Sequence, residues 1–121
     1  MQKTFLLTAG NIDAISAEIQ IFLKQQKQDK EHIIKVCLSA ETALLRWMEC
    51  GYENKEIILE CKVNFGRPII CLLLAGENCN PLEVSDDDLN EYFNIVQANV
   101  GNIVTFRYAR KTNIVEIIFH A

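Results

Sequence analysis

The sequence predicts a two-layer α/β sandwich, in which helices cover one face of a mixed, mostly antiparallel sheet. Two long segments repeat apolar residues at spacings of three and four, which is typical of amphipathic helices. Five shorter segments are rich in β-branched and aromatic residues or alternate in polarity, as strands do. Several of these strands follow one another through short polar turns, which favours antiparallel pairing with the helices gathered on one sheet face.

The first half of the chain contains a strand and two helices. Residues 3–8 are a candidate strand, and Asn11 is the expected N-cap of the helix that follows. Asp29 is expected to cap the second helix, and Gly51 to end it in a left-handed conformation. Because this second helix has two apolar stripes, we expect it to be largely buried. One stripe contains Ile33, Val36, Ala40, Leu44 and Trp47, the other contains Ile34, Leu38, Leu45 and Met48, and the narrow polar face carries Lys35, Ser39, Thr42, Arg46 and Glu49.

The second half begins with residues 57–64, which alternate in polarity and predict a half-buried strand. A turn at residues 65–67 leads to residues 69–75, which are apolar throughout and suit a central strand. Ser85 and the acids Asp86, Asp87 and Asp88 predict the start of a third helix, which Gly101 ends. Residues 103–108 and 113–119 then predict a terminal hairpin.

The length and composition indicate one domain, residues 1–121, which is either a small protein or a module excised from a larger one. A chain of 121 residues can bury a sufficient core without a disulfide or a metal. The longest apolar run, residues 69–75, is too short to cross a bilayer, and the start of the chain lacks the features of a secretory signal. We therefore expect a cytoplasmic protein that does not insert into membranes.

The formal net charge of −4 argues against nucleic acid as a partner, since the only basic cluster, Arg107, Arg110 and Lys111, is confined to one turn. The five cysteines form no C-x-x-C motif and mostly lie in apolar segments, so we expect reduced, hydrophobic side chains. Cys79 lies in a polar loop and is the cysteine to test for reactivity. Neither His32 nor His120 has partners at a metal-ligand spacing.

Three stretches together cover about residues 31–120 and resemble one known family. They are "CLSAETALLRWMECG", "GRPIICLLLAGENCNPLE" and "FNIVQANVGNIVTFRYARKTNIVEIIF". They are similar to the second helix, the strand with its "D-x-G" turn and "F-N-P-L", and the last helix and hairpin of the histidine-kinase-like ATPase superfamily. The closest resemblance is to the anti-sigma-factor serine kinase branch. It implies the histidine-kinase-like ATPase fold, with a nucleotide pocket beside the second helix.

The residues that carry the family's chemistry are replaced in this chain. Aligned on Gly51, the magnesium-binding asparagine falls on Arg46 and the general base falls on Thr42. A shift of one residue restores an acid, Glu41, but places Leu45 at the asparagine position. Arginine supplies neither a ligand oxygen for Mg²⁺ nor a base, so metal-dependent phosphoryl transfer would be compromised.

The loop that follows residues 69–75 departs from the family in the same way. The aspartate that recognises the adenine amino group falls on Leu74, which cannot accept a hydrogen bond, while Gly76, Asn78 and Asn80 keep the polar loop. The family's glycine-rich lid is replaced by "LEVSDDDLNEYF", which has no glycine and places three acids, Asp86, Asp87 and Asp88, where phosphate would approach and be repelled. The loop is therefore expected to preserve the backbone course of a nucleotide pocket whose recognising side chains are gone.

Three hypotheses follow. The first is a catalytically silent regulatory domain without a cofactor, which binds a regulatory protein or an attached domain, or pairs with a second copy. The second is a divergent ATP-binding serine kinase or anti-sigma regulator, with ATP, magnesium and a direct contact between Arg46 and phosphate. The third is a purely structural domain whose resemblance to the family is accidental.

Individual residues also have simpler interpretations. Glu41 can be a functional acid, but a cap or an ion pair with Arg46 or Lys35 is favoured, and Arg46 is equally suited to a solvated helix face. Capping is favoured over metal binding for the acids after Ser85, because adjacent side chains at a helix start point in different directions. Trp47 and Phe93 are most simply core residues.

Overall fold

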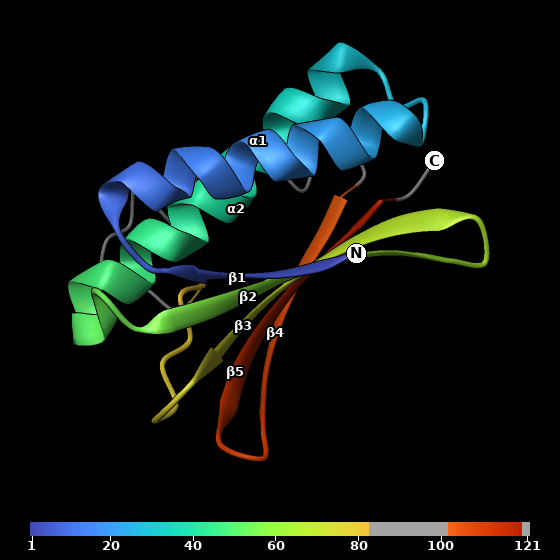
Figure 1. Ribbon diagram of the computed structural model, residues 1–121. Coiled ribbons are helices and arrows are strands. Elements are labelled where there is room, and N and C mark those ends of the chain that lie inside the picture. Colours follow the sequence, from blue (N-terminus) through green and yellow to red (C-terminus); the bar gives the residue numbers. More distant parts are fainter. Residues whose placement is uncertain (83–101, 120–121) are drawn as a thin grey trace.

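The computed structural model describes residues 1–82 and 102–119. Two helices lie together on one face of a twisted five-stranded sheet (Figure 1). The elements are β1 (Gln2–Leu6), α1 (Ala9–Gln25), α2 (Lys30–Trp47) with a π-helical turn (Met48–Tyr52), β2 (Glu56–Asn64), β3 (Arg67–Ala75), β4 (Asn102–Ala109) and β5 (Thr112–Phe119). The α/β class and the two-layer arrangement are thus confirmed. The expected third helix, with Ser85, Asp86, Asp87, Asp88, Phe93 and Gly101, lies outside the described residues, as does His120.

The strand order is β1-β2-β3-β5-β4, and every neighbouring pair is antiparallel. The sheet in the described residues is therefore antiparallel rather than mixed. The β2–β3 turn forms at Phe65 and Gly66 and the β4–β5 turn at Arg110 and Lys111, each with two residues at positive φ. Such two-residue turns match the right-handed twist of the strands that they join.

The core lies between the helices and the sheet. Leu7, which directly follows β1, is buried in this core, and α1 and α2 pack their apolar faces against it from above. From β3, Ile70, Leu72 and Leu74 alternate toward the helices. The largest fully buried side chains are Trp47, Leu7, Ile15, Ile19, Leu23, Leu44, Ile57, Leu59, Ile70, Leu72, Leu74 and Ile117. Burial of these side chains is the main force that holds the two layers together.

The start of α1 differs from the prediction. Thr8, not Asn11, is the N-cap, because its backbone is extended and its hydroxyl accepts a hydrogen bond from the Asn11 amide at 3.2 Å. Asn11 lies inside the helix and donates its side-chain amide to the Leu6 carbonyl at 2.8 Å. The Asp29 cap of α2 is confirmed, since its carboxylate accepts from the His32 amide at 2.9 Å.

The prediction that both apolar stripes of α2 are buried is wrong. Ile34, Leu38 and Leu45 of the second stripe are 49%, 40% and 49% exposed. In a two-layer fold, α2 packs against the sheet below and α1 beside it, so one side of the helix contacts neither. These three exposed residues, called the α2 stripe below, form an apolar surface.

Candidate functional site

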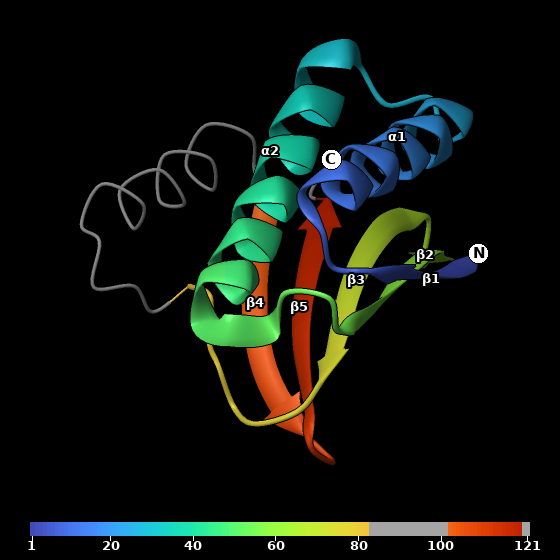
Figure 2. The ribbon, with the colours of Figure 1, turned by 60° about the vertical axis from the view of Figure 1, so that its left-hand side comes forward.

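The candidate site lies where the C-terminal end of α2 meets the loop that follows β3, residues 76–82. In Figure 2 this yellow loop leaves the end of β3 and passes close to the green turn that ends α2. Gly51 has a φ of 97°, a left-handed conformation that glycine adopts without strain, so it turns the chain back toward the sheet as predicted.

Asn113, at the start of β5, holds the loop from below. Its side chain is fully buried and lies opposite Leu74 in the sheet register. The side-chain oxygen accepts a hydrogen bond from the Cys79 amide at 2.8 Å, and the side-chain amide donates to the carbonyls of Leu74 at 3.1 Å and Glu77 at 2.9 Å. One buried amide therefore satisfies three backbone groups where the strand ends and the loop begins.

Trp47 holds the loop from above. Its ring is fully buried, and its Nε1 donates a hydrogen bond to the Cys79 carbonyl at 2.9 Å. The amide and the carbonyl of Cys79 are thus bound from opposite sides, one by β5 and the other by α2. These contacts fix the backbone of the loop at Cys79.

Tyr52 and Tyr108 fix the first residues of the loop. The Tyr52 hydroxyl donates to the Glu77 carbonyl at 2.6 Å, and the Tyr108 hydroxyl donates to the Gly76 carbonyl at 2.7 Å. Gly76 has a φ of 143°, and a Cβ at this position would lie 2.8 Å from the Tyr52 ring. Glycine is therefore required here both by the backbone conformation and by the closeness of the ring.

Arg46 lies on the helix face beside this loop, with a side chain that is 17% exposed. Its Nη1 pairs with Glu49 Oε2 at 2.5 Å, one helical turn further along. Its Nε is buried and has no hydrogen-bond acceptor in residues 1–82 and 102–119. Burial and the hydrogen bond with Cys50 raise the pKa of Cys79, and the positive charge of Arg46 lowers this pKa by a smaller amount.

The other predicted site residues of α2 do not converge on the loop. The Thr42 hydroxyl donates to the Leu38 carbonyl at 2.7 Å, within its own helix. Glu41 does not form either expected ion pair, because Lys35 pairs with Glu31 and Arg46 pairs with Glu49. Glu41 instead acts electrostatically on Cys37, which packs toward α1.

The predicted residues of the loop have structural roles or face solvent. Leu74 is fully buried in the core, and Asn78 is exposed. Asn80 accepts a hydrogen bond from the Leu82 amide through its side-chain oxygen at 2.9 Å, a local turn that asparagine commonly forms. The structure brings Arg46 and the loop together, but it places the Leu74 side chain under the helices.

Cys50 and Cys79 form a thiol pair that the sequence did not indicate. Their Sγ atoms lie 2.6 Å apart, and neither cysteine is in a disulfide. Cys50 is exposed and Cys79 is partly exposed, whereas Cys37, Cys61 and Cys71 are buried, as expected of cysteines in apolar segments. Partial burial and the contact with Cys50 raise the pKa of Cys79, so Cys79 by itself is not an activated thiol.

The side chains that hold the loop were mostly missed by sequence reasoning. Trp47 was correctly expected in the core, but its hydrogen bond links residues 32 positions apart and leaves no local pattern. Asn113 could have been noticed, since asparagine is depleted in strands and its presence there suggests a specific hydrogen-bonding role. Tyr52 and Tyr108 gave no distinguishing signal.

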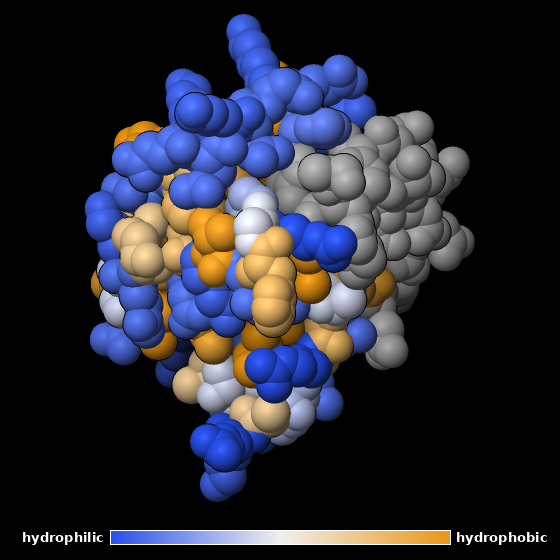
Figure 3. All heavy atoms as spheres, turned by 90° about the vertical axis from the view of Figure 1, so that its right-hand side faces the viewer, coloured by the Kyte–Doolittle hydropathy of each residue, from blue (hydrophilic) through white to orange (hydrophobic). Residues whose placement is uncertain are grey.

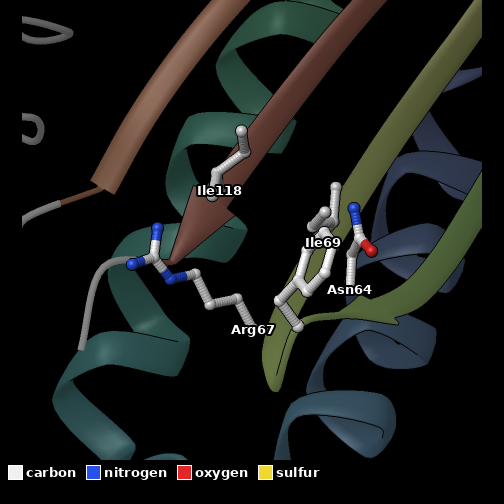
Figure 4. Close-up of a pocket in the computed structure, with 5 residues that line it drawn as sticks. Asn64, Arg67, Ile69 and Ile118 are labelled. Carbon is white, nitrogen blue, oxygen red and sulfur yellow. The ribbon is translucent and has the colours of Figure 1, made fainter.

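The surface also has hollows away from this site. One of about 390 Å³ lies at the β2–β3 hairpin and is lined by Asn64, Phe65, Arg67, Ile69 and Ile118. Figure 4 shows Arg67 reaching from β3 toward the end of β5. In Figure 3, which faces the right-hand side of the molecule in Figure 1, apolar residues lie among hydrophilic ones below a hydrophilic upper region. The only ionisable side chain among the residues that line this hollow is Arg67, so the lining lacks the paired acid and base of a hydrolytic site.

Searches with this chain match neither a protein-family model nor a curated protein. Residues 1–82 and 102–119 contain no cluster of three or more histidine, cysteine or acidic residues that could hold a metal ion. Neither α1 nor α2 is long and apolar enough to cross a membrane.

Proposed function

We propose that this chain is a catalytically silent domain of the histidine-kinase-like ATPase fold that regulates by binding another protein or an attached domain. The observation that carries the proposal is the attachment of residues 76–82 to the protein itself. Trp47, Tyr52 and Asn113 bind the backbone of the segment that, by the resemblance, would face a nucleotide. The Glu77 carbonyl and both backbone groups of Cys79 are thus already bound by side chains of the same chain.

The side chains at the motif positions support the same proposal. Leu74, at the position of the adenine-recognising acid, is fully buried, and its side chain has no polar atom to hydrogen-bond an adenine ring. Admission of a base between the loop and α2 would break the Trp47–Cys79 and Tyr52–Glu77 hydrogen bonds, each worth about 1 kcal/mol. Arg46 and Thr42 supply no carboxylate or amide oxygen for a magnesium ion.

The exposed α2 stripe supports binding to a protein. Ile34, Leu38 and Leu45 follow one another along one side of the helix at spacings of four and seven residues. An apolar row of this kind loses contact with water when a partner packs against it, which is the usual driving force of association. A domain that acts by association requires such a surface, whereas a domain that acts only by catalysis does not.

Calorimetric titration and thermal melting with ATP, ADP and magnesium test the proposal. We expect no heat of binding and no change in melting temperature at millimolar nucleotide. A true ligand at a hundred times its Kd would stabilise the fold by about 2.7 kcal/mol, which melting would detect. Magnesium-dependent binding with a micromolar Kd would refute the proposal.

The second candidate is a divergent ATP-binding serine kinase, or an anti-sigma regulator, in which Arg46 contacts phosphate. The buried Arg46 Nε, which has no acceptor within residues 1–82 and 102–119, favours it, because a buried guanidinium nitrogen normally has an acceptor and phosphate is a good one. If nucleotide binds, Arg46→Ala should weaken binding at least tenfold, and Arg46→Lys should restore only part of the affinity. Equal affinity of the wild type and Arg46→Ala would eliminate this candidate.

A further inference from the structure

The Cys50–Cys79 thiol pair joins two segments that are 29 positions apart in the sequence. Cys50 belongs to the π-helical turn after α2, and Cys79 lies in the middle of the loop formed by residues 76–82. Their Sγ separation of 2.6 Å is shorter than the contact of two unbonded sulfur atoms and longer than a disulfide bond of about 2.05 Å. The two sulfur atoms therefore need only a small movement to bond.

The surrounding contacts hold both thiols in this position. The Cys79 backbone is bound on one side by Asn113 and on the other by Trp47. Cys50 directly precedes Gly51, whose left-handed conformation fixes the course of the turn. Because the fold has already brought the thiols together, little conformational entropy remains to be lost when they bond.

The remaining cysteines have different surroundings. Cys37, Cys61 and Cys71 are buried. Desolvation raises the pKa of Cys61 to about 11 and that of Cys71 to about 12, so both stay protonated at neutral pH. Of the five cysteines, only Cys50 is exposed, and its nearest sulfur is that of Cys79.

We propose that Cys50 and Cys79 are a thiol–disulfide exchange site, which a small-molecule disulfide such as oxidised glutathione converts to an intramolecular disulfide. In the first step the Cys50 thiol gives its proton to solvent, and its sulfur attacks one sulfur of the small disulfide. A mixed disulfide forms at Cys50, and one small thiolate leaves. In the second step Cys79 gives its proton to solvent and attacks the Cys50 sulfur, which releases the second thiolate. Two protein thiols are oxidised, and the small disulfide is reduced to two thiols.

The exposures of the two cysteines set this order. The exposed Cys50 can be reached by a small disulfide, whereas Cys79 is partly covered and its raised pKa disfavours the first attack. Once the mixed disulfide has formed, Cys79 is already beside the sulfur that it must attack. The product joins the end of α2 covalently to residues 76–82. The proposal does not depend on the proposed function, since it needs only the geometry of the two thiols.

The test uses the full chain, first reduced and then incubated with excess oxidised glutathione. Intact-mass spectrometry should show the loss of two hydrogens and no retained glutathione, and peptide mapping should place the bond between Cys50 and Cys79. The melting temperature should rise by about 10 °C, because the disulfide restricts the unfolded chain. A reducing agent should reverse both changes.

Two matched variants separate the steps. Cys79→Ser should retain one glutathione on Cys50, because the resolving thiol is gone, while Cys50→Ser should react at least tenfold more slowly. Circular dichroism should confirm that both variants keep the fold. The proposal fails if the wild type retains glutathione as Cys79→Ser does, if a different cysteine pair is bonded, or if the product is a disulfide-linked dimer on a non-reducing gel.

Discussion

The two ends of α2 are held in different ways. At the N-terminal end the interactions are local: Asp29 caps the helix, and Lys35 pairs with Glu31 four residues earlier. At the C-terminal end, Trp47 and Tyr52 donate hydrogen bonds to carbonyls 32 and 25 positions away. The N-terminal end of the helix is thus stabilised by residues of the helix itself and its cap, and the C-terminal end by hydrogen bonds to the loop after β3. Substitutions at the C-terminal end should therefore affect the whole fold more than those at the N-terminal end.

The largest effect is expected from Asn113→Ala. The substitution leaves the Cys79 amide and the carbonyls of Leu74 and Glu77 without their side-chain partner. At about 1 kcal/mol for each hydrogen bond, the free energy of unfolding should fall by about 3 kcal/mol, measured by urea denaturation. Asn78→Ala is the matched control in the same loop, and its exposed side chain predicts a change within about 0.5 kcal/mol. Equal effects of the two substitutions would mean that Asn113 does not support the loop.

Trp47→Phe should have an intermediate effect. Phenylalanine keeps most of the buried ring but has no donor for the Cys79 carbonyl, so we expect a loss of about 2 kcal/mol from the hydrogen bond and the smaller ring. Urea denaturation followed by far-ultraviolet circular dichroism measures it without depending on tryptophan fluorescence. Trp47 and Asn113 both bind the Cys79 backbone. If they stabilise the loop together, the losses of unfolding free energy from Trp47→Phe and Asn113→Ala should be non-additive in a double-mutant cycle.

Asp29→Ala tests the locally determined end and should have a smaller effect. Loss of the cap leaves the His32 amide without its side-chain acceptor and should cost about 1 kcal/mol. Asp29→Ser is the conservative control, because serine can also cap a helix and should restore most of the stability. An effect of Asp29→Ala larger than that of Asn113→Ala would reverse the comparison between the two ends.

High pH should weaken the C-terminal end selectively. The pKa of Cys79 in the folded protein is raised above its ordinary value of about 9.0, first by desolvation and then by its hydrogen bond with Cys50. The unfolded chain therefore releases this proton at a lower pH, so stability is complete below about pH 9 and falls as the pH rises beyond it. Denaturation of the reduced protein between pH 8 and about pH 10.5 should show a smaller decline for Cys79→Ser than for the wild type. An unchanged slope would contradict the raised pKa.

The difference between local and long-range contacts explains which parts of the fold the sequence could predict. Residues 30–47 have a helical periodicity and residues 69–75 are apolar throughout, and both elements form where expected. Asp29 and Gly51 act on neighbouring residues, so their cap and turn were also predictable. Local patterns of this kind were sufficient for the α/β class and the order of the described elements.

The candidate site was less predictable because its contacts are long-range. The expected ion pairs of Glu41 do not form, because Lys35 pairs with Glu31 and Arg46 pairs with Glu49, and the sequence alone does not show which acid lies closer to each cation. Asn113 and Cys50 acquire their roles only when β5 and α2 lie beside residues 76–82. No spacing along the chain encodes that proximity. The ATPase-fold assignment itself stays a prediction from the resemblance.

The hydrogen bond between Trp47 and Cys79 encloses the entire β2–β3 hairpin between its two ends. A hairpin can often open by itself, but here separation of its strands also strains the link to α2. The amide protons of β2 and β3 should therefore exchange with solvent deuterium at the same rate as those at the end of α2, as one cooperative unit. The indole and the loop that it binds would make helix and hairpin unfold together.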